Sequence, residues 1–149
     1  MVSSLLIIAF SVVLFLYWFR YTCLLILKTK TSRDYACQVA HANHLNFLEV
    51  SSRLQREPTG QFASLHESLA RDYRVLTYLL RHTASFPFKG RSVEQTMLMA
   101  DFKLMQVYYA ITGKFAASQA RYALEEMSYI LSHFANEMGE RTVVLPKVA

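Results

Sequence analysis

The chain has 149 residues, of which 53% are hydrophobic and 18% are charged, and its formal net charge is +5. This length is typical of one small domain, and this composition excludes an intrinsically disordered chain, which is poor in apolar residues and rich in charge. Four glycines and three prolines exclude collagen-like and turn-dense all-β folds, and two cysteines are too few for a disulfide scaffold.

Residues 2–19 form a long apolar segment without a charged residue. As a helix they would be about 27 Å long, close to the roughly 30 Å of a bilayer's hydrocarbon core. Tyr17, Trp18 and Phe19 end the segment, as in the aromatic belts of membrane-spanning helices. A cleaved signal peptide is the alternative, but the basic N-terminal region and the clean small-residue cleavage site that it requires are missing. The segment therefore predicts a membrane span.

Basic residues follow this span, and none precedes it. Lys28, Lys30 and Arg33 lie directly after the apolar segment, and the positive-inside rule places such residues in the cytoplasm. We therefore expect residues 1–30 to form a transmembrane helix with a basic juxtamembrane segment. Its N-terminus would lie outside, and the C-terminal domain would be cytoplasmic.

Arg20 interrupts the apolar segment, which resumes at Leu24 and extends to Leu27. We expect the Arg20 side chain to reach the lipid headgroups, with these leucines at the interface. Apolar surface then lies where a neighbouring membrane subunit would sit. The residues expected at the membrane interface or against such a partner are Tyr17, Trp18, Phe19, Arg20, Leu24, Leu27, Lys28, Lys30 and Arg33.

The rest of the chain shows helical periodicity and no strand-like alternation of useful length. It predicts helices over residues 32–56, 61–82 and 92–112, and a fourth that follows the break at Gly113 and ends near Met138. Ser32 is the expected N-cap of the first helix, Ser92 and Gln95 form a capping box, and Gly139 is a suitable C′ residue. The predicted fold class is all-α: a single N-terminal transmembrane helix, an antiparallel bundle of about four helices over residues 31–139, and a C-terminal tail over residues 140–149.

Two of these helices carry one apolar stripe, and the helix over residues 92–112 carries two. In the helix over residues 61–82 the stripe is Phe62, Leu65, Leu69, Tyr73, Leu76 and Leu80. In the fourth helix it is Ala116, Ala120, Ala123, Met127, Ile130, Phe134 and Met138. In the helix over residues 92–112 one stripe is Val93, Met97, Ala100, Leu104, Val107, Tyr108 and Ile111. The other stripe is Leu98, Phe102, Met105 and Tyr109. A helix with two apolar faces lies between neighbours, so this one is the expected central helix unless one face meets another protein.

Few residue patterns in the chain point to chemistry. His41 and His44 lie three apart on the first predicted helix, so they would share a face and are the weak candidates for a metal or haem site. The chain has no His-Glu-x-x-His motif, no Glu-x-x-His motif and no phosphate-binding loop, and we expect neither cysteine to form a nucleophilic pair with a histidine. We therefore expect no catalytic residue, no cofactor, no metal and no small-molecule substrate.

The net charge lies mostly in one short segment. Residues 20–33 hold four basic and no acidic residues, whereas residues 34–149 hold the other 12 basic and all 11 acidic residues. Because a nucleic-acid-binding protein carries its basic face on the folded part, no nucleic-acid partner is expected. A weaker excess remains at Arg71, Arg74, Arg81, Lys89 and Arg91, against Asp72, and the loop aromatics Phe86 and Phe88 lie beside it in the sequence. These residues are a possible partner surface, although acidic residues near the C-terminus could pair with them inside the fold.

Together these features favour a non-enzymatic, single-pass accessory or scaffold subunit that docks on and stabilises a larger membrane complex, for example a respiratory or photosynthetic one. Its expected partners are subunits of that complex and the lipid bilayer. The alternative is a membrane-tethered binding or regulatory module that recruits a soluble partner. A third reading is a metal or haem protein built around His41 and His44.

Overall fold

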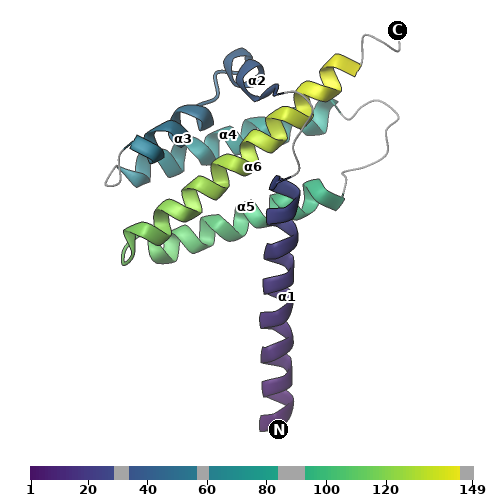
Figure 1. Ribbon diagram of the computed structural model, residues 1–149, viewed down its shortest axis with the longest axis vertical. Helices are drawn as coiled ribbons and strands as arrows, with labels where there is room; N and C mark the ends of the chain where they lie inside the picture. The colour runs from purple at the N-terminus through teal and green to yellow at the C-terminus, as the bar shows by residue number, and fades with distance from the viewer. Residues whose placement is uncertain (29–33, 57–60, 84–92, 145–149) are drawn as a thin grey trace. The chain divides into compact units, whose positions relative to one another are not determined.

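The computed structural model describes residues 1–28, 34–56, 61–83 and 93–144. These residues form the helices α1 (Val2–Lys28), α2 (Ala36–Ala42), α3 (Phe47–Arg56), α4 (Phe62–Thr83), α5 (Val93–Thr112) and α6 (Ala117–Val144), shown in Figure 1. No strand occurs among them, which confirms the predicted all-α fold. The chain divides into two compact units, Met1–Lys30 and Thr31–Ala149.

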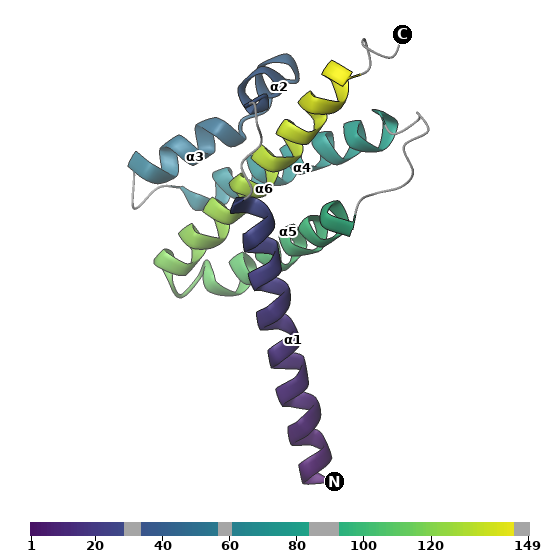
Figure 2. The ribbon, with the colours of Figure 1, turned by 45° about the vertical axis from the view of Figure 1, so that its right-hand side comes forward.

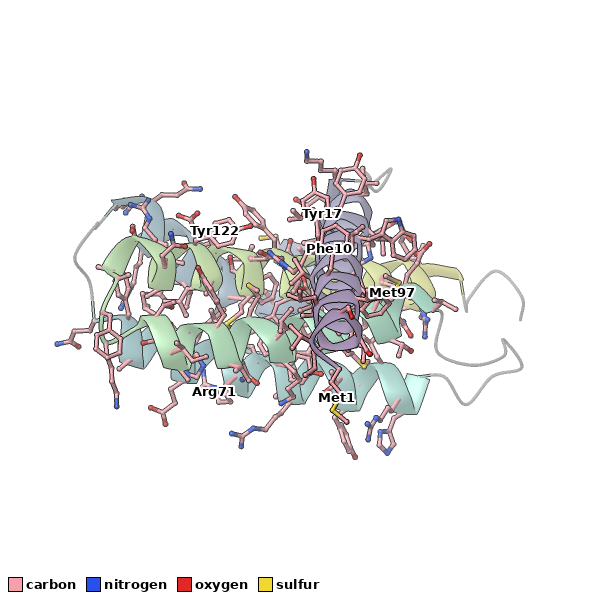
Figure 3. The ribbon with its side chains drawn as sticks, turned by 90° about the horizontal axis from the view of Figure 1, so that it is seen from below. Met1, Phe10, Tyr17, Arg71, Met97 and Tyr122 are labelled. Atoms are coloured by element: carbon pink, nitrogen blue, oxygen red, sulfur yellow. The ribbon has the colours of Figure 1, made fainter. Side chains whose placement is uncertain are left out.

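Helix α1 is a single uninterrupted helix, long and apolar enough to cross a membrane. Its 27 residues correspond to about 40 Å. Side chains such as Phe10 and Tyr17 project outward from it (Figure 3). The Thr22 hydroxyl donates a hydrogen bond to the Trp18 carbonyl oxygen one turn earlier, at 2.9 Å, so this polar group is satisfied within the helix.

The second unit is organised around α6. Helices α2, α3, α4 and α5 all pack against it, and α4, α5 and α6 alternate in direction along the chain (Figure 1). Figures 1 and 2 both show α3 and α5 on opposite sides of α6. The predicted central helix, over residues 92–112, is therefore the wrong one: α5 has α6 as its main neighbour, whereas α6 is surrounded.

The side chains of α6 explain its central position. Its buried apolar residues are Ala120, Ala123, Leu124, Met127, Ile130, Leu131, Phe134, Ala135 and Met138. The predicted stripe is confirmed from Ala120 onward, and Leu124, Leu131 and Ala135 beside it are also buried, so the buried side of α6 is wider than the predicted stripe. Alanines allow neighbouring backbones to approach closely, and the larger residues fill the space between the other helices.

The predicted helix over residues 32–56 is two helices, α2 and α3, separated by a turn. In this turn the Asn43 amide donates to the Val39 carbonyl oxygen at 2.9 Å, and His44 adopts a positive φ of 53°. Leu45 and Phe47 on either side of Asn46 are both buried. Residues two apart lie on nearly opposite sides of a straight helix, and the break turns both of these side chains toward the core.

Helix α6 continues past Gly139 to Val144, so the prediction that Gly139 ends the helix is wrong. Gly139 lies inside the helix and is buried, and a Cβ atom there would overlap the side chain of Tyr35. The Tyr35 N–H donates to Asn136 Oδ1 at 2.8 Å, one turn earlier on α6. Gly139 therefore serves close approach rather than helix termination.

The remaining helix boundaries agree with the sequence analysis more closely. The predicted break at Gly113 separates α5 from α6, and α4 covers the predicted 61–82 segment within one residue at each end. The expected cap at Ser32, the capping residue Ser92 and residues 145–149 of the predicted tail lie outside the described residues. Asp34 precedes α2 and accepts a hydrogen bond from the Ala36 N–H at 3.0 Å, so it caps the helix from outside.

Candidate functional site

The candidate membrane segment is α1, which carries most of the predicted interface residues. Tyr17 and Trp18 are exposed, and the Phe19 ring stacks on Phe15 with centroids 6.4 Å apart. Arg20, Leu24 and Leu27 continue the same helix, and Lys28 ends it, where a cation interacts favourably with the helix dipole. Lys30 and Arg33 lie outside the described residues.

The histidine pair does not form as predicted. His41 lies in the last turn of α2, whereas His44 lies in the turn after it and has a positive φ, so the two do not share a helical face. Both side chains are exposed. Among the described residues no group of three or more histidine, cysteine, aspartate or glutamate side chains is arranged to hold a metal ion.

Asp72 is a buried carboxylate of α4 that the sequence analysis treated as a surface charge. Its Oδ2 accepts a hydrogen bond from the Asn46 N–H at 2.6 Å, at the residue that precedes α3. Burial raises the pKa of Asp72, while the backbone N–H of Asn46, the Arg71 guanidinium and the Phe47 N–H act in the opposite direction. A side chain of α4 thus caps the N-terminus of α3.

Stacked rings line the contact between α4 and α5. His66 stacks on Tyr109 with centroids 4.5 Å apart, and Tyr73 stacks on Phe102 at 4.1 Å. Burial lowers the pKa of His66 and raises the pKa of Tyr109, so both groups favour their neutral forms. Two neutral stacked rings pack well, and we assign this contact to the stability of the bundle.

Two acidic residues of α6 form ion pairs within that helix. Glu125 lies 2.9 Å from Arg121, and Glu137 lies 2.9 Å from Arg141, each one turn apart on the same helix. Glu137 also accepts a hydrogen bond from the Gln95 amide at 2.5 Å, which joins α5 to α6. These two carboxylates therefore pair with residues of α5 and α6 rather than with the arginines of α4.

The outer face of α4 collects the predicted basic residues. Arg71, Arg74 and Arg81 are exposed, and Arg71 is labelled in Figure 3. Their spacing places them on one side of the helix with Tyr78, which is also exposed and whose ring lies 4.0 Å from that of His82. Lys89, Arg91 and the loop aromatics Phe86 and Phe88 lie outside the described residues. We call Arg71, Arg74, Tyr78 and Arg81 the basic face.

The outer face of α5 is apolar. Leu98, Phe102 and Met105 of one predicted stripe are buried against the bundle. The other stripe faces outward: Val93, Val107 and Ile111 are exposed, and Met97 and Leu104 are partly exposed. Phe115, in the turn between α5 and α6, is 87% exposed. We call Leu104, Val107, Ile111 and Phe115 the apolar face.

Three surfaces of the described chain thus stand out as candidates for interaction: α1, the basic face of α4 and the apolar face of α5. Residues of all three surfaces are visible in the sequence, but the sequence does not distinguish the inner stripe of α5 from the outer one. Neither a protein-family model, nor a curated protein, nor a solved structure matches this chain.

Proposed function

We propose that this protein is a non-enzymatic, single-pass membrane protein that acts as an accessory or scaffold subunit of a larger membrane complex. The observation that carries the proposal is α1, whose apolar 18-residue window is not buried at all by the rest of the described chain. So much apolar surface requires lipid or other transmembrane helices around it. The basic residues that follow the helix support a cytoplasmic location for the bundle.

One side of α1 is suited to a neighbouring helix. Ser4 and Ser11 are two turns apart and therefore lie on the same side. In lipid, small residues allow helices to approach closely, and their hydroxyl groups form hydrogen bonds between helices. This side of α1 is the proposed contact with the host complex.

The experiment is purification in mild detergent followed by native mass measurement of a C-terminally tagged chain. A membrane partner in fixed stoichiometry supports the proposal. Ser4→Leu combined with Ser11→Leu should lower recovery of that partner without lowering membrane retention. The matched control, Ala9→Leu combined with Val13→Leu, enlarges the opposite side of α1 and should leave recovery unchanged. A chain that is extracted alone would contradict the proposal.

Orientation is tested separately. With the bundle in the cytoplasm, a C-terminal tag is shielded from protease added to intact cells and becomes cleavable after lysis. Cleavage of the bundle in intact cells would contradict the proposed orientation.

The basic face of α4 supports a second candidate function, a membrane-tethered module that recruits an acidic soluble protein. Arg71, Arg74 and Arg81 lie on one exposed side of a helix with the exposed ring of Tyr78, and arginine and tyrosine are enriched where proteins bind each other. Under this alternative, Arg74→Ser combined with Arg81→Ser abolishes recovery of a salt-sensitive soluble partner. Under the leading proposal, the same variant retains its membrane partner.

A further inference from the structure

The apolar face of α5 is a preformed surface at the tip of the α5–α6 hairpin. The Tyr108 hydroxyl donates to Gln119 Oε1 at 2.6 Å and joins the two helices. The turn is closed by hydrogen bonds from the Gly113 N–H to the Tyr109 carbonyl oxygen at 2.7 Å and from the Ala116 N–H to the Thr112 carbonyl oxygen at 2.8 Å. A Cβ atom on Gly113 would approach the Tyr109 carbonyl oxygen to 2.8 Å, so a larger residue would disturb this turn.

The fixed tip presents large apolar side chains outward. Phe115 is 87% exposed, Ile111 is 63% exposed and Val107 is 57% exposed. The spacing of four residues places Val107 and Ile111 on one side of α5, and Phe115 follows them in the turn. A soluble helix normally carries polar residues on this side, so the face fits an apolar environment.

The charged residues that neighbour the face along the chain are basic. Between Phe102 and Ala120 the charged residues are Lys103 and Lys114, and both are exposed. Lys103 Nζ lies 5.0 Å from the centroid of the Tyr73 ring, on the side toward α4, whereas Lys114 lies in the turn beside Phe115. Apolar side chains flanked by lysines and without acids are the pattern of segments that bind the surface of anionic membranes.

The covalent chain keeps the bundle within reach of a bilayer if α1 spans one. Seven residues, 29–35, connect Lys28 to Ala36, and this connection reaches at most about 30 Å when fully extended. A contact too weak to hold a free protein on a membrane is sufficient when the same chain is already anchored, because the local concentration of the surface is high.

We infer that the apolar face of α5 docks on the anionic surface of the bilayer that α1 spans, with Phe115 and Ile111 entering the headgroup region and Lys114 contacting lipid phosphates. This inference rests on the proposed membrane anchor. A second copy of the chain is a poorer occupant, because a symmetric contact would place basic residues opposite basic residues with no acid on the face.

The test uses the fact that Trp18 is the only tryptophan of the chain. Full-length protein is reconstituted in vesicles of phosphatidylcholine and phosphatidylglycerol whose acyl chains are brominated near the headgroups, so that bromine quenches tryptophan at the interface. Wild-type Trp18 reports on the anchor. In a Trp18→Phe background, quenching of the tryptophan in Phe115→Trp measures whether the apolar face reaches the lipid. Ile111→Trp in the same background measures this at a second position of the face. Tyr78→Trp in that background is the control on the basic face of α4.

We expect quenching of the tryptophan at position 115 or 111 and little quenching at position 78. Lys114→Gln should lower the ratio of docked to undocked bundle about fivefold, since each lysine near an anionic surface contributes about that factor. Replacing the anionic vesicles by vesicles of phosphatidylcholine alone should lower the ratio of docked to undocked bundle at least as much.

The possible failures are distinguishable. An unquenched Trp18 in the wild type would overturn the proposed anchor. A quenched Trp18, with positions 115 and 111 quenched no more than position 78, would overturn the docking alone. Blue-shifted but unquenched fluorescence at position 115 would show that a protein covers the face, and this result would also overturn the docking.

Discussion

Helices α4 and α5 pack against the same helix, α6, and stack rings against each other, yet their outer faces differ in chemistry. The outer side of α4 carries three arginines, as a solvated helix does, whereas the outer side of α5 carries Val107 and Ile111. Burying one such side chain stabilises an assembly by about 1.5–3 kcal/mol. We therefore expect α4 to face water or a polar partner and α5 to face an apolar environment.

The largest expected effect separates the inner side of α5 from its outer side. Phe102 is fully buried and stacks on Tyr73, so Phe102→Ala should destabilise the bundle by about 3–5 kcal/mol. Ile111→Ala, the control on the outer side, should change the stability by less than about 0.5 kcal/mol in detergent. Denaturant unfolding followed by circular dichroism measures both. Equal losses would show that the outer side of α5 also belongs to the core.

The next prediction disturbs the bundle without altering either outer face. Gly139→Ala places a methyl group against Tyr35 and should cost about 1–3 kcal/mol, partly offset by the better helix propensity of alanine. The double variant with Tyr35→Gly removes the overlapping side chain and should show a favourable coupling in a double-mutant cycle. Purely additive losses would contradict the close approach.

A pH dependence is expected from the inner side of α4. Burial raises the pKa of Asp72, so the folded protein binds this proton more tightly than the unfolded chain does. The resulting contribution to the free energy of unfolding is complete below about pH 4, the ordinary pKa of aspartate. It is lost as the pH rises through the raised pKa of the folded state. The stability of the wild type relative to Asp72→Asn should therefore fall as the pH rises from about 4. A constant difference across this range would contradict the assignment.

The smallest effects sharpen the contrast between the two outer faces. Arg74→Ser and Val107→Ser should each change stability in detergent by less than about 0.5 kcal/mol, because both side chains are exposed. In anionic vesicles Val107→Ser should weaken the contact of the bundle with lipid, whereas Arg74→Ser should not. Protease accessibility of the reconstituted bundle compares the two variants, and identical profiles would remove the distinction between α4 and α5.

Much of the fold could be predicted because it depends on apolar periodicity. The stripe at Leu65, Leu69, Leu76 and Leu80 is long and regular, and it identified both the bounds and the inner side of α4. The break at Gly113 also had a local signal, since glycine is unfavourable inside a helix.

The errors arose where one residue type serves two purposes. Gly139 has the sequence pattern of a helix end, but in the fold it permits close contact with Tyr35. The alanines of α6 gave little hydrophobic signal, so the central helix was misplaced. The break at His44 follows from the burial of both Leu45 and Phe47, which depends on tertiary packing.

The site could be predicted only in part. The charge-free stretch of α1 and the arginines of α4 are visible in the sequence, but the two stripes of α5 are similar in character, and only the fold decides which one is buried. The buried position of Asp72 did have a signal: it lies three residues after Leu69 and four before Leu76, inside the apolar stripe.

The contact of Tyr35 with α6 has a mechanical consequence. Tyr35 is the second described residue after the segment that follows α1, and its N–H is held by Asn136 while its side chain lies against Gly139. Tension applied through an anchored N-terminus therefore enters the bundle at this contact, before it reaches α2. It is transmitted to α6, against which α2, α3, α4 and α5 pack, so the load is borne by the most extensively packed element of the bundle rather than by the short helix α2.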